Sequence, residues 1–234
     1  MDDTPEASVT GARLLREMLD RIQDGRWPIG GSLPGERVLM AEFAVSRVAL
    51  REALAALRAL GVLEVAHGRR SRVRPVGAEV LACLFPLVLA QQEGNAARHM
   101  LQVRLALEPT MAALAAEQRS AAHLEALQAA SEATLRHAGS GGEAFIDHDL
   151  AFHRALADAC GNPLLGTVVD ALARFYERSV AQNATELAEH RERAARDHQG
   201  ITAAIAAGDA DLARRRMEAH LRSTASRRAR GLDS

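Results

Sequence analysis

The sequence predicts a mainly α-helical protein in two parts. The first is a small N-terminal unit of three helices closed by a short β-hairpin, and the second is a C-terminal antiparallel all-helical bundle. Hydrophobic residues make up 48% of the 234 residues and aromatic residues only 3%. A core of Ala, Leu and Val without aromatics favours closely packed helices over strands. Apolar residues recur at helical spacing through both parts, and strand-like segments occur only in the first.

The first part is expected to span residues 10–76, after a flexible N-terminus of residues 1–9. Thr10 can cap a helix whose apolar residues include Leu14, Met18 and Ile22. Glycines and a proline then mark a loop. The elements expected after that loop are a helix at 36–43, a break at 44–45, a helix at 47–60 capped by Ser46, and two extended pieces at 62–66 and 71–74. This order is that of a winged helix-turn-helix with a small β-wing.

The second part is expected to span residues 77–230. Its predicted helices are separated by short Gly-, Asn- and Ser-containing breaks. Short connections between long amphipathic helices predict an antiparallel bundle. The helices are expected at 78–92, 95–118, 120–137, 143–160, 163–185, 187–207 and 209–230.

The charge is unevenly distributed although the net charge is only −1. Residues 25–75 hold nine arginines against four glutamates, whereas residues 76–234 hold 17 arginines against 20 acidic residues. The chain as a whole is therefore not an electrostatic nucleic-acid binder, but its first part is expected to contact nucleic acid.

The sequence predicts a cytoplasmic protein without a membrane segment. Two cysteines, Cys83 and Cys160, make no disulfide framework. The first ten residues are acidic and polar, unlike a signal peptide. The longest apolar run, residues 80–90, contains Pro86 and is too short to cross a bilayer.

Residues 32–73 contain, in order, Leu-Pro, Glu-Arg, Val-Ser-Arg, Leu-Arg-Glu-Ala-Leu, Gly-Val-Leu and a glycine-bearing wing. This segment resembles the DNA-binding domain of the GntR family of regulators. Arg47 and Arg51 stand four residues apart on one helix face, where each could bind a guanine edge in the major groove. Gly35 and Val48 depart from the usual Ser cap and Thr or Ser of the family. The resemblance implies DNA contacts by Arg37, Ser46, Arg47, Arg51, His67 and Gly68.

Residues 103–116, 149–165, 197–213 and 217–221 are similar to the ligand-binding domain of the FadR-like subgroup of that family. Asp149 and His153 share a helix face at four-residue spacing, and two later helices carry His198 and His220. The resemblance implies that these four residues hold a divalent transition metal, with Zn, Ni, Mn and Fe all compatible. It also implies that Arg104 binds a carboxylate effector. The alternative for Arg104 is an internal pair with Glu108, four residues on.

These observations predict a sequence-specific DNA-binding transcription regulator, not an enzyme. We expect a repressor that binds a pseudo-palindromic operator as a homodimer and responds to a small organic-acid effector. Two alternatives stay open. The dipeptide His148-Asp149 would suit a metal-dependent hydrolase of the HD type. A helical domain that only dimerises would make the chain an effector-free architectural DNA-binding protein.

Overall fold

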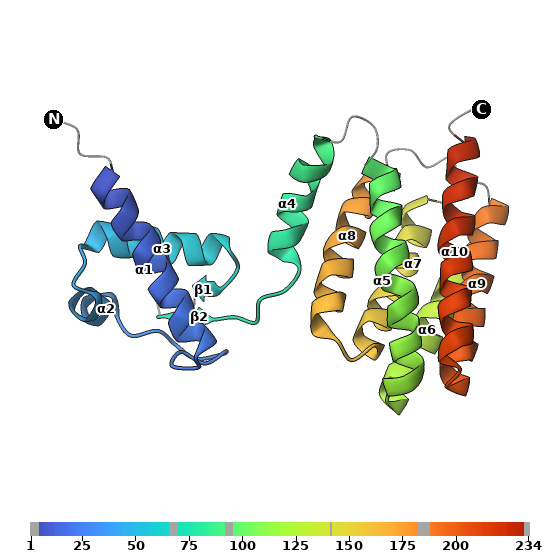
Figure 1. Ribbon diagram of the computed structural model, residues 1–234, viewed down its shortest axis with the longest axis horizontal. Helices are drawn as coiled ribbons and strands as arrows, with labels where there is room; N and C mark the ends of the chain where they lie inside the picture. Colours follow the sequence, from blue (N-terminus) through green and yellow to red (C-terminus); the bar gives the residue numbers. More distant parts are fainter. Residues whose placement is uncertain (1–4, 66–69, 92–95, 141, 182–187, 232–234) are drawn as a thin grey trace. The chain divides into compact units, whose positions relative to one another are not determined.

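The computed structural model describes the chain except residues 1–4, 66–69, 92–95, 141, 182–187 and 232–234. It divides into two compact units, Met1–Val80 and Leu81–Ser234. The described residues of the first unit form three helices and a two-stranded antiparallel sheet. All the secondary structure described in the second unit is helical. The predicted fold class is confirmed: a helix-turn-helix with a small β-wing is followed by a helical domain (Figure 1).

Helix α1 (Pro5–Gln23) begins five residues before the expected cap at Thr10. Proline is favoured in the first turn because its missing N–H has no partner there in any case, and its backbone angle suits a helix. Thr10 therefore lies inside the helix, as do residues 5–9 of the segment expected to be flexible. Leu14 and Met18 are buried, and α1 lies across α3 in the unit's core (Figure 1).

The helix-turn-helix is formed by α2 (Glu36–Phe43) and α3 (Arg47–Ala59). Between them, Ala44 adopts a left-handed conformation with φ 52°. Ser46 caps α3 as predicted, and its Oγ accepts a hydrogen bond from the Ala49 N–H at 3.2 Å. The buried face of α3 carries apolar side chains at helical spacing: Leu50, Ala53, Leu54 and Leu57.

The wing consists of β1 (Leu63–Val65) paired with β2 (Ser71–Val73). In this antiparallel pair, Leu63 lies opposite Val73, and both side chains are buried in the core of the unit. Ser32 adds a bridge to Arg72 from the loop before α2. The predicted wing contacts His67 and Gly68 lie outside the described residues.

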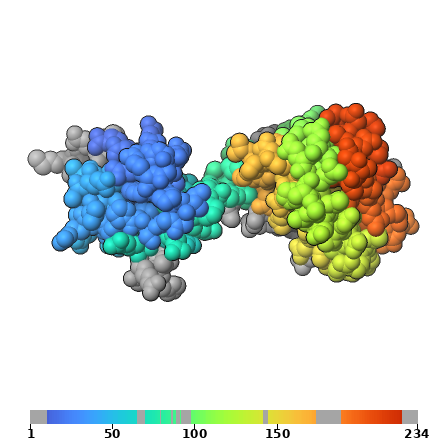
Figure 2. All heavy atoms as spheres, turned by 90° about the horizontal axis from the view of Figure 1, so that it is seen from below, coloured from blue at the N-terminus to red at the C-terminus, as the bar shows by residue number. Residues whose placement is uncertain are grey.

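The second unit continues from α4 (Glu79–Ala90) into six further helices. Helix α5 packs along α10, α6 along α7, and α9 against both α6 and α10. The side chains of α5 (green) and α10 (red) meet directly at the surface in Figure 2. The helices are α5 (Ala96–Gln118), α6 (Ala121–His137), α7 (Gly142–Ala159), α8 (Pro163–Ala181), α9 (Ala188–Ala207) and α10 (Ala210–Gly231).

One continuous apolar core joins most of these helices. Met111, Phe152, Ile201 and Met217 are fully buried in it, on α5, α7, α9 and α10 respectively. Small alanines at further buried positions allow the helices to approach closely. None of the described helices is both long and apolar enough to cross a membrane.

Candidate metal centre and DNA-reading helix

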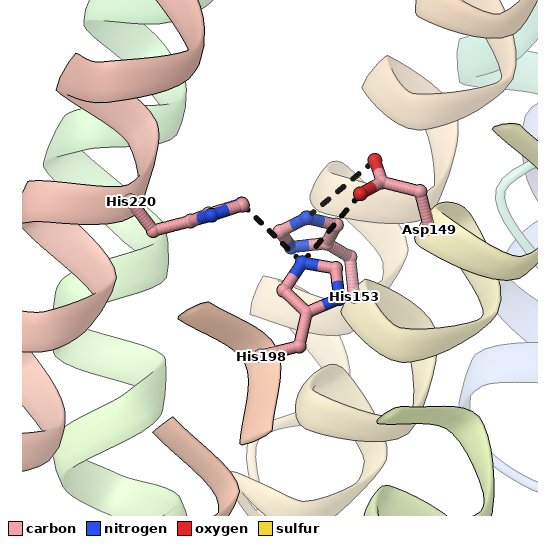
Figure 3. A group of neighbouring side chains, drawn as sticks. All are labelled: Asp149, His153, His198 and His220. Atoms are coloured by element: carbon pink, nitrogen blue, oxygen red, sulfur yellow. Dashed lines mark hydrogen bonds and ion pairs between the residues drawn. The ribbon is translucent and has the colours of Figure 1, made fainter. Parts of the chain in front are cut away.

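Four potential metal ligands meet inside the second unit. Asp149 and His153 come from successive turns of α7, His198 from α9 and His220 from α10. Each offers one ligand atom, and these four atoms all lie within 4.8 Å of one another. The side chains point toward one another from three helices (Figure 3). The structure thus brings together all four residues that the sequence analysis singled out as ligands.

Two of the distances within this cluster suit a shared ion. Nε2 of His198 lies 3.3 Å from Nε2 of His220 and 3.5 Å from Oδ1 of Asp149. Nε2 of His153 lies 4.0 Å from Oδ2 of Asp149. Two donors bound at about 2.1 Å to one tetrahedral ion lie roughly 3.4 Å apart. The separations of His198 from its two neighbours therefore match those that a bound ion would require.

Burial disfavours the protonation of two of the three imidazoles, His198 and His220. Burial lowers the pKa of His198 well below its ordinary value, and the neighbouring charges of His220, His153 and Arg104 lower it further. Burial also lowers the pKa of His220, although a contact with Asp197 partly opposes that shift. Neutral imidazole is the form that binds metals. The cluster therefore holds at least two histidines in their ligating form at neutral pH.

His198 is held in place by stacking. Its ring lies 3.8 Å from the ring of Phe152, with an angle of 13° between the planes. Phe152 is fully buried and belongs to the main core. The orientation of His198 therefore depends on apolar packing between α7 and α9.

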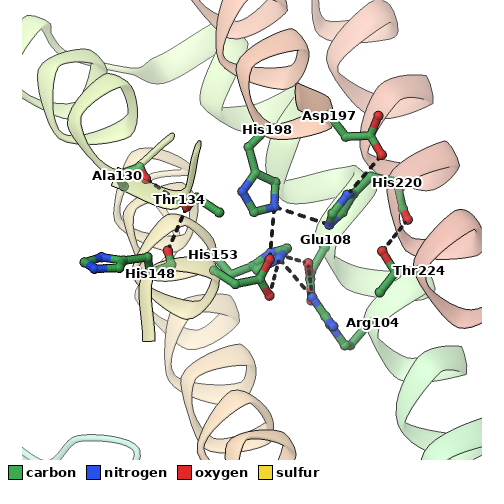
Figure 4. A network of polar contacts seen from close by, with 11 residues as sticks. Arg104, Glu108, Ala130, Thr134, His148, His153, Asp197, His198, His220 and Thr224 are labelled. Carbon is green, nitrogen blue, oxygen red and sulfur yellow. Dashed lines mark hydrogen bonds and ion pairs between the residues drawn. The ribbon is translucent and has the colours of Figure 1, made fainter. Parts of the chain in front are cut away.

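A buried ion pair on α5 adjoins the cluster (Figure 4). Nε of Arg104 donates to Oε1 of Glu108 at 2.5 Å, and Nη2 lies 3.3 Å from Oε2. Burial alone would raise the pKa of Glu108, but the charges of Arg104 and His153 outweigh it and hold the pKa well below its usual range. Conversely, burial would lower the pKa of Arg104, but the charge of Glu108 raises it. The internal pair considered in the sequence analysis is therefore formed.

The same pair reaches His153 from two sides. Nη2 of Arg104 lies 3.1 Å from Nε2 of His153, and Oε2 of Glu108 lies 2.8 Å from Nδ1 of the same ring. Arg104 thus lies beside a candidate metal ligand, where an effector carboxylate could meet both groups. Effector binding by Arg104 is still a prediction.

Sequence reasoning missed two acidic neighbours of the cluster. Glu108 was considered only as a partner of Arg104, yet it also contacts His153. Asp197 was not singled out, yet its Oδ2 lies 3.5 Å from Nδ1 of His220 (Figure 4). Its place directly before His198 in the sequence was the one available signal.

His148, the first residue of the His-Asp dipeptide, does not join the cluster. Its ring stacks on that of His137, with 4.0 Å between the ring centres. Asp149 instead faces His153, one turn along α7 (Figure 3). The dipeptide therefore does not act as a pair of ligands at this centre.

The residues predicted to contact DNA that the structure describes lie on the outer face of the first unit. Arg37 on α2 and Arg47 and Arg51 on α3 are all exposed, as is the cap residue Ser46. The opposite face of α3 is buried, with Leu50 fully enclosed. Packing therefore leaves the two arginines of α3 directed away from the unit's core. Their contacts with DNA stay predictions.

Comparison with known proteins decides the family. Residues 10–73 match the family described as bacterial regulatory proteins, gntR family, and residues 99–223 match the FCD domain. The chain belongs to the GntR family. It is a transcriptional regulator with a GntR helix-turn-helix and the C-terminal FCD domain of the FadR-like subgroup. Membership of this family of DNA-binding regulators implies that the partner of the chain is operator DNA.

Known repressors resemble this GntR regulator over nearly its whole length. The HTH-type transcriptional repressor NanR of Klebsiella aerogenes is 34% identical over 221 residues, which cover 92% of this chain and 84% of that protein. NanR of Escherichia coli K12 is also 34% identical, over 91% of this chain and 80% of that protein. These relatives are transcriptional repressors, which favours a regulator over the hydrolase alternative.

A solved structure of a GntR protein from Streptococcus agalactiae shares the fold. It aligns with a TM-score of 0.70 and covers 95% of this chain and 99% of that chain. The sequence identity is 24%, so this likeness concerns the fold alone.

Proposed function

We propose that this GntR regulator is a repressor whose affinity for its operator is controlled by a small carboxylate effector, bound beside a divalent metal in the FCD domain. One observation carries the proposal. Asp149, His153, His198 and His220 converge from three helices beside the apolar core of the bundle. Buried polar groups without structural partners are costly, so a cluster of this kind is typical of a binding site.

The donor set fits a divalent transition metal. One carboxylate and three imidazoles suit Zn, Ni, Mn or Fe. The formal charges of the site also suit a divalent cation. Three carboxylates and one guanidinium leave two negative charges unbalanced; they belong to Asp149, Glu108, Asp197 and Arg104. A divalent cation supplies that balance. When bound, the ion would act as a Lewis acid that attracts an anionic ligand.

Arg104 gives the site its preference for a carboxylate. Four protein ligands fill a tetrahedral ion, but an ion that expands to five or six ligands has room for a carboxylate oxygen as well. Guanidinium groups bind carboxylates through paired hydrogen bonds. Because Glu108 already contacts Arg104, an effector competes with Glu108 or binds beside it. That exchange would give the effector a way to alter the contact between α5 and α7.

The DNA-binding part of the proposal assigns Arg47 and Arg51 to base edges, and Arg37 and Ser46 to the phosphate backbone. A homodimer would present one such helix to each half of a pseudo-palindromic operator. An effector would change operator affinity only by binding two arrangements of the dimer unequally. The predicted domain limits, 10–76 and 77–230, assign DNA binding and sensing to separate parts of the chain.

Capture of fragmented genomic DNA on the purified protein tests the DNA-binding assignment. The test variant is Arg47→Ala/Arg51→Ala, and the matched control is Arg16→Ala, an exposed arginine on α1. Each guanine contact is worth about 1–3 kcal/mol, so the double variant should lose at least about thirtyfold in affinity for the recovered sites. Equal enrichment by the double variant would overturn the assignment of α3.

The recovered operator then tests the sensing assignment. Operator affinity is measured by fluorescence anisotropy with Zn²⁺ or a chelator, and with a panel of small hydroxy acids and sugar acids. We expect at least one carboxylate to weaken binding, and His198→Ala to abolish the response while keeping DNA binding. Operator binding that is insensitive to metal and carboxylates in the unmodified protein would instead favour the architectural alternative.

A further inference from the structure

The outer nitrogens of the three candidate histidine ligands differ in their surroundings. If each imidazole binds a metal through Nε2, its Nδ1 faces away from the ion. For His153 this outer nitrogen lies 2.8 Å from Glu108, and for His220 it lies 3.5 Å from Asp197. Neither ring N–H is aligned for a hydrogen bond, but both carboxylates are at ion-pair distance. His198 has Phe152 against its ring face instead.

The contacts of His153 specify which of its nitrogens carries the proton. Arginine can only donate hydrogen bonds, so the contact of Arg104 at Nε2 requires a lone pair there. An ionised carboxylate can only accept, so Glu108 favours the proton on Nδ1. The two neighbours therefore both favour the proton on Nδ1, and a metal bound at Nε2 would take the lone pair that Arg104 contacts in this structure. Nε2 is also the atom that faces Asp149.

Asp197 makes the equivalent selection at His220. Its carboxylate lies on the Nδ1 side, while Nε2 of His220 faces Nε2 of His198. The two carboxylates come from different helices, α5 and α9, and each reaches a histidine on another helix. They therefore fix the ring orientation across the helix interfaces on which the cluster is built (Figure 4).

We propose that Glu108 and Asp197 are positioning residues of the metal centre, which hold His153 and His220 with Nε2 directed at the ion. This inference rests on the proposed metal site and extends it to residues that would not touch the metal. A carboxylate on the outer nitrogen orients the ring and raises the basicity of the ligating nitrogen. Loss of such a partner typically costs about 10–100-fold in metal affinity.

The two residues should contribute unequally. The side chain of Glu108 is 1% exposed and is fixed by Arg104, whereas that of Asp197 is 30% exposed. Water can replace part of the role of Asp197 but cannot easily reach Glu108. We therefore expect the larger loss of metal affinity from Glu108→Gln and a loss of about tenfold from Asp197→Asn.

Zn²⁺ affinity of the full-length protein, measured by competition with a chromophoric chelator, tests the inference. Asp197→Asn is the principal variant because a substitution at this partly exposed position should leave the fold intact. Glu192→Gln is the matched control, since Glu192 lies on the same helix and pairs only with Arg196 among the ion pairs shown. Asp197→Glu retains a carboxylate and should recover part of the affinity.

A melting temperature measured in chelator separates positioning from general stability. Asp197→Asn should melt as the unmodified protein does without metal, yet gain less on addition of Zn²⁺. Unchanged Zn²⁺ affinity in both Asp197→Asn and Glu108→Gln would overturn the inference while leaving the metal site intact. If the unmodified protein binds neither Zn²⁺ nor Ni²⁺, Mn²⁺ or Fe²⁺, and His198→Ala behaves identically, the proposed metal site fails as well.

Discussion

Arg104 and Glu108 form a buried ion pair one helical turn apart on α5, with Nε and Oε1 2.5 Å apart. Their side chains are 13% and 1% exposed, respectively, so neither charge is well solvated. Removing one member of a buried pair leaves the other charge uncompensated, whereas replacing both with apolar groups can be nearly neutral. A group that binds Arg104 and displaces Glu108 would therefore leave the buried charge of Glu108 on α5 without its partner.

Arg104→Met should lower the free energy of unfolding by about 3–5 kcal/mol, because it leaves Glu108 buried without its guanidinium partner. The double variant Arg104→Met/Glu108→Leu should recover most of that loss. Urea denaturation in the presence of a chelator measures both without interference from metal. Equal losses in the single and double variants would contradict this account of the pair.

The buried histidines predict that the metal-free protein loses stability in mild acid. Burial lowers the pKa values of His198 and His220 below 6.5, so the unfolded chain binds more protons than the folded one just below that pH. The free energy of unfolding should be greatest above about pH 6.5 and fall as the pH drops toward 5. Glu108 adds little in this range and only near pH 5, because its pKa lies well below the range in the fold and near 4.5 in the unfolded chain.

Urea unfolding at several pH values between about 5 and 7.5, in chelator, measures this dependence. His198→Gln should flatten the pH profile, whereas His190→Gln, two turns earlier on α9, should preserve its slope. A profile in His198→Gln as steep as in the unmodified protein would show that the acid sensitivity originates elsewhere.

The sequence predicted local features of the candidate site better than contacts between helices. The pairing of Asp149 and His153 follows from their spacing on one helix. Their approach to His198 and His220 depends on how α7, α9 and α10 pack, which spacing does not reveal, and only the family resemblance linked the four. The contact of Glu108 with His153 depends likewise on the packing of α5 against α7.

Helix boundaries show a similar division. The cap at Ser46 was predicted because a serine before a helical pattern can accept a backbone N–H. Thr10 satisfied the same rule but lies inside α1. Helix α1 begins at Pro5 instead, because proline and an acidic residue in the first turn also favour a helix N-terminus. Capping residues therefore identify possible starts, and the wider sequence selects among them.

The turn between α2 and α3 predicts a stabilising substitution. Ala44 has φ 52°, a left-handed conformation that a Cβ atom disfavours. Ala44→Gly should raise the free energy of unfolding by up to about 1 kcal/mol, because relief of roughly 1–2 kcal/mol of strain outweighs the roughly 0.5–1 kcal/mol entropy cost of glycine. Ala55→Gly, at an exposed position within α3, should instead lower it by roughly 0.5–1 kcal/mol. Thermal unfolding compares the stability of the two variants. A lower stability of Ala44→Gly would show that the backbone of Ala44 is not strained.

Ser46 offers a way to separate helix capping from DNA binding. Its Oγ accepts the Ala49 N–H, so Ser46→Ala should lower stability by about 0.5–2 kcal/mol. Aspartate caps helices as well as serine does, so Ser46→Asp should retain stability. Its negative charge would, however, face the phosphate backbone beside Arg47 and should weaken operator binding and its salt dependence.

Thermal unfolding and operator binding at several salt concentrations, applied to both Ser46 variants, complete the test. A stable Ser46→Asp protein with reduced operator affinity would place Ser46 at the DNA interface. If Ser46→Asp bound the operator as tightly as the unmodified protein, Ser46 would be a cap alone. The phosphate contact would then have to come from another exposed residue of the first unit, with Arg37 on α2 the first to test.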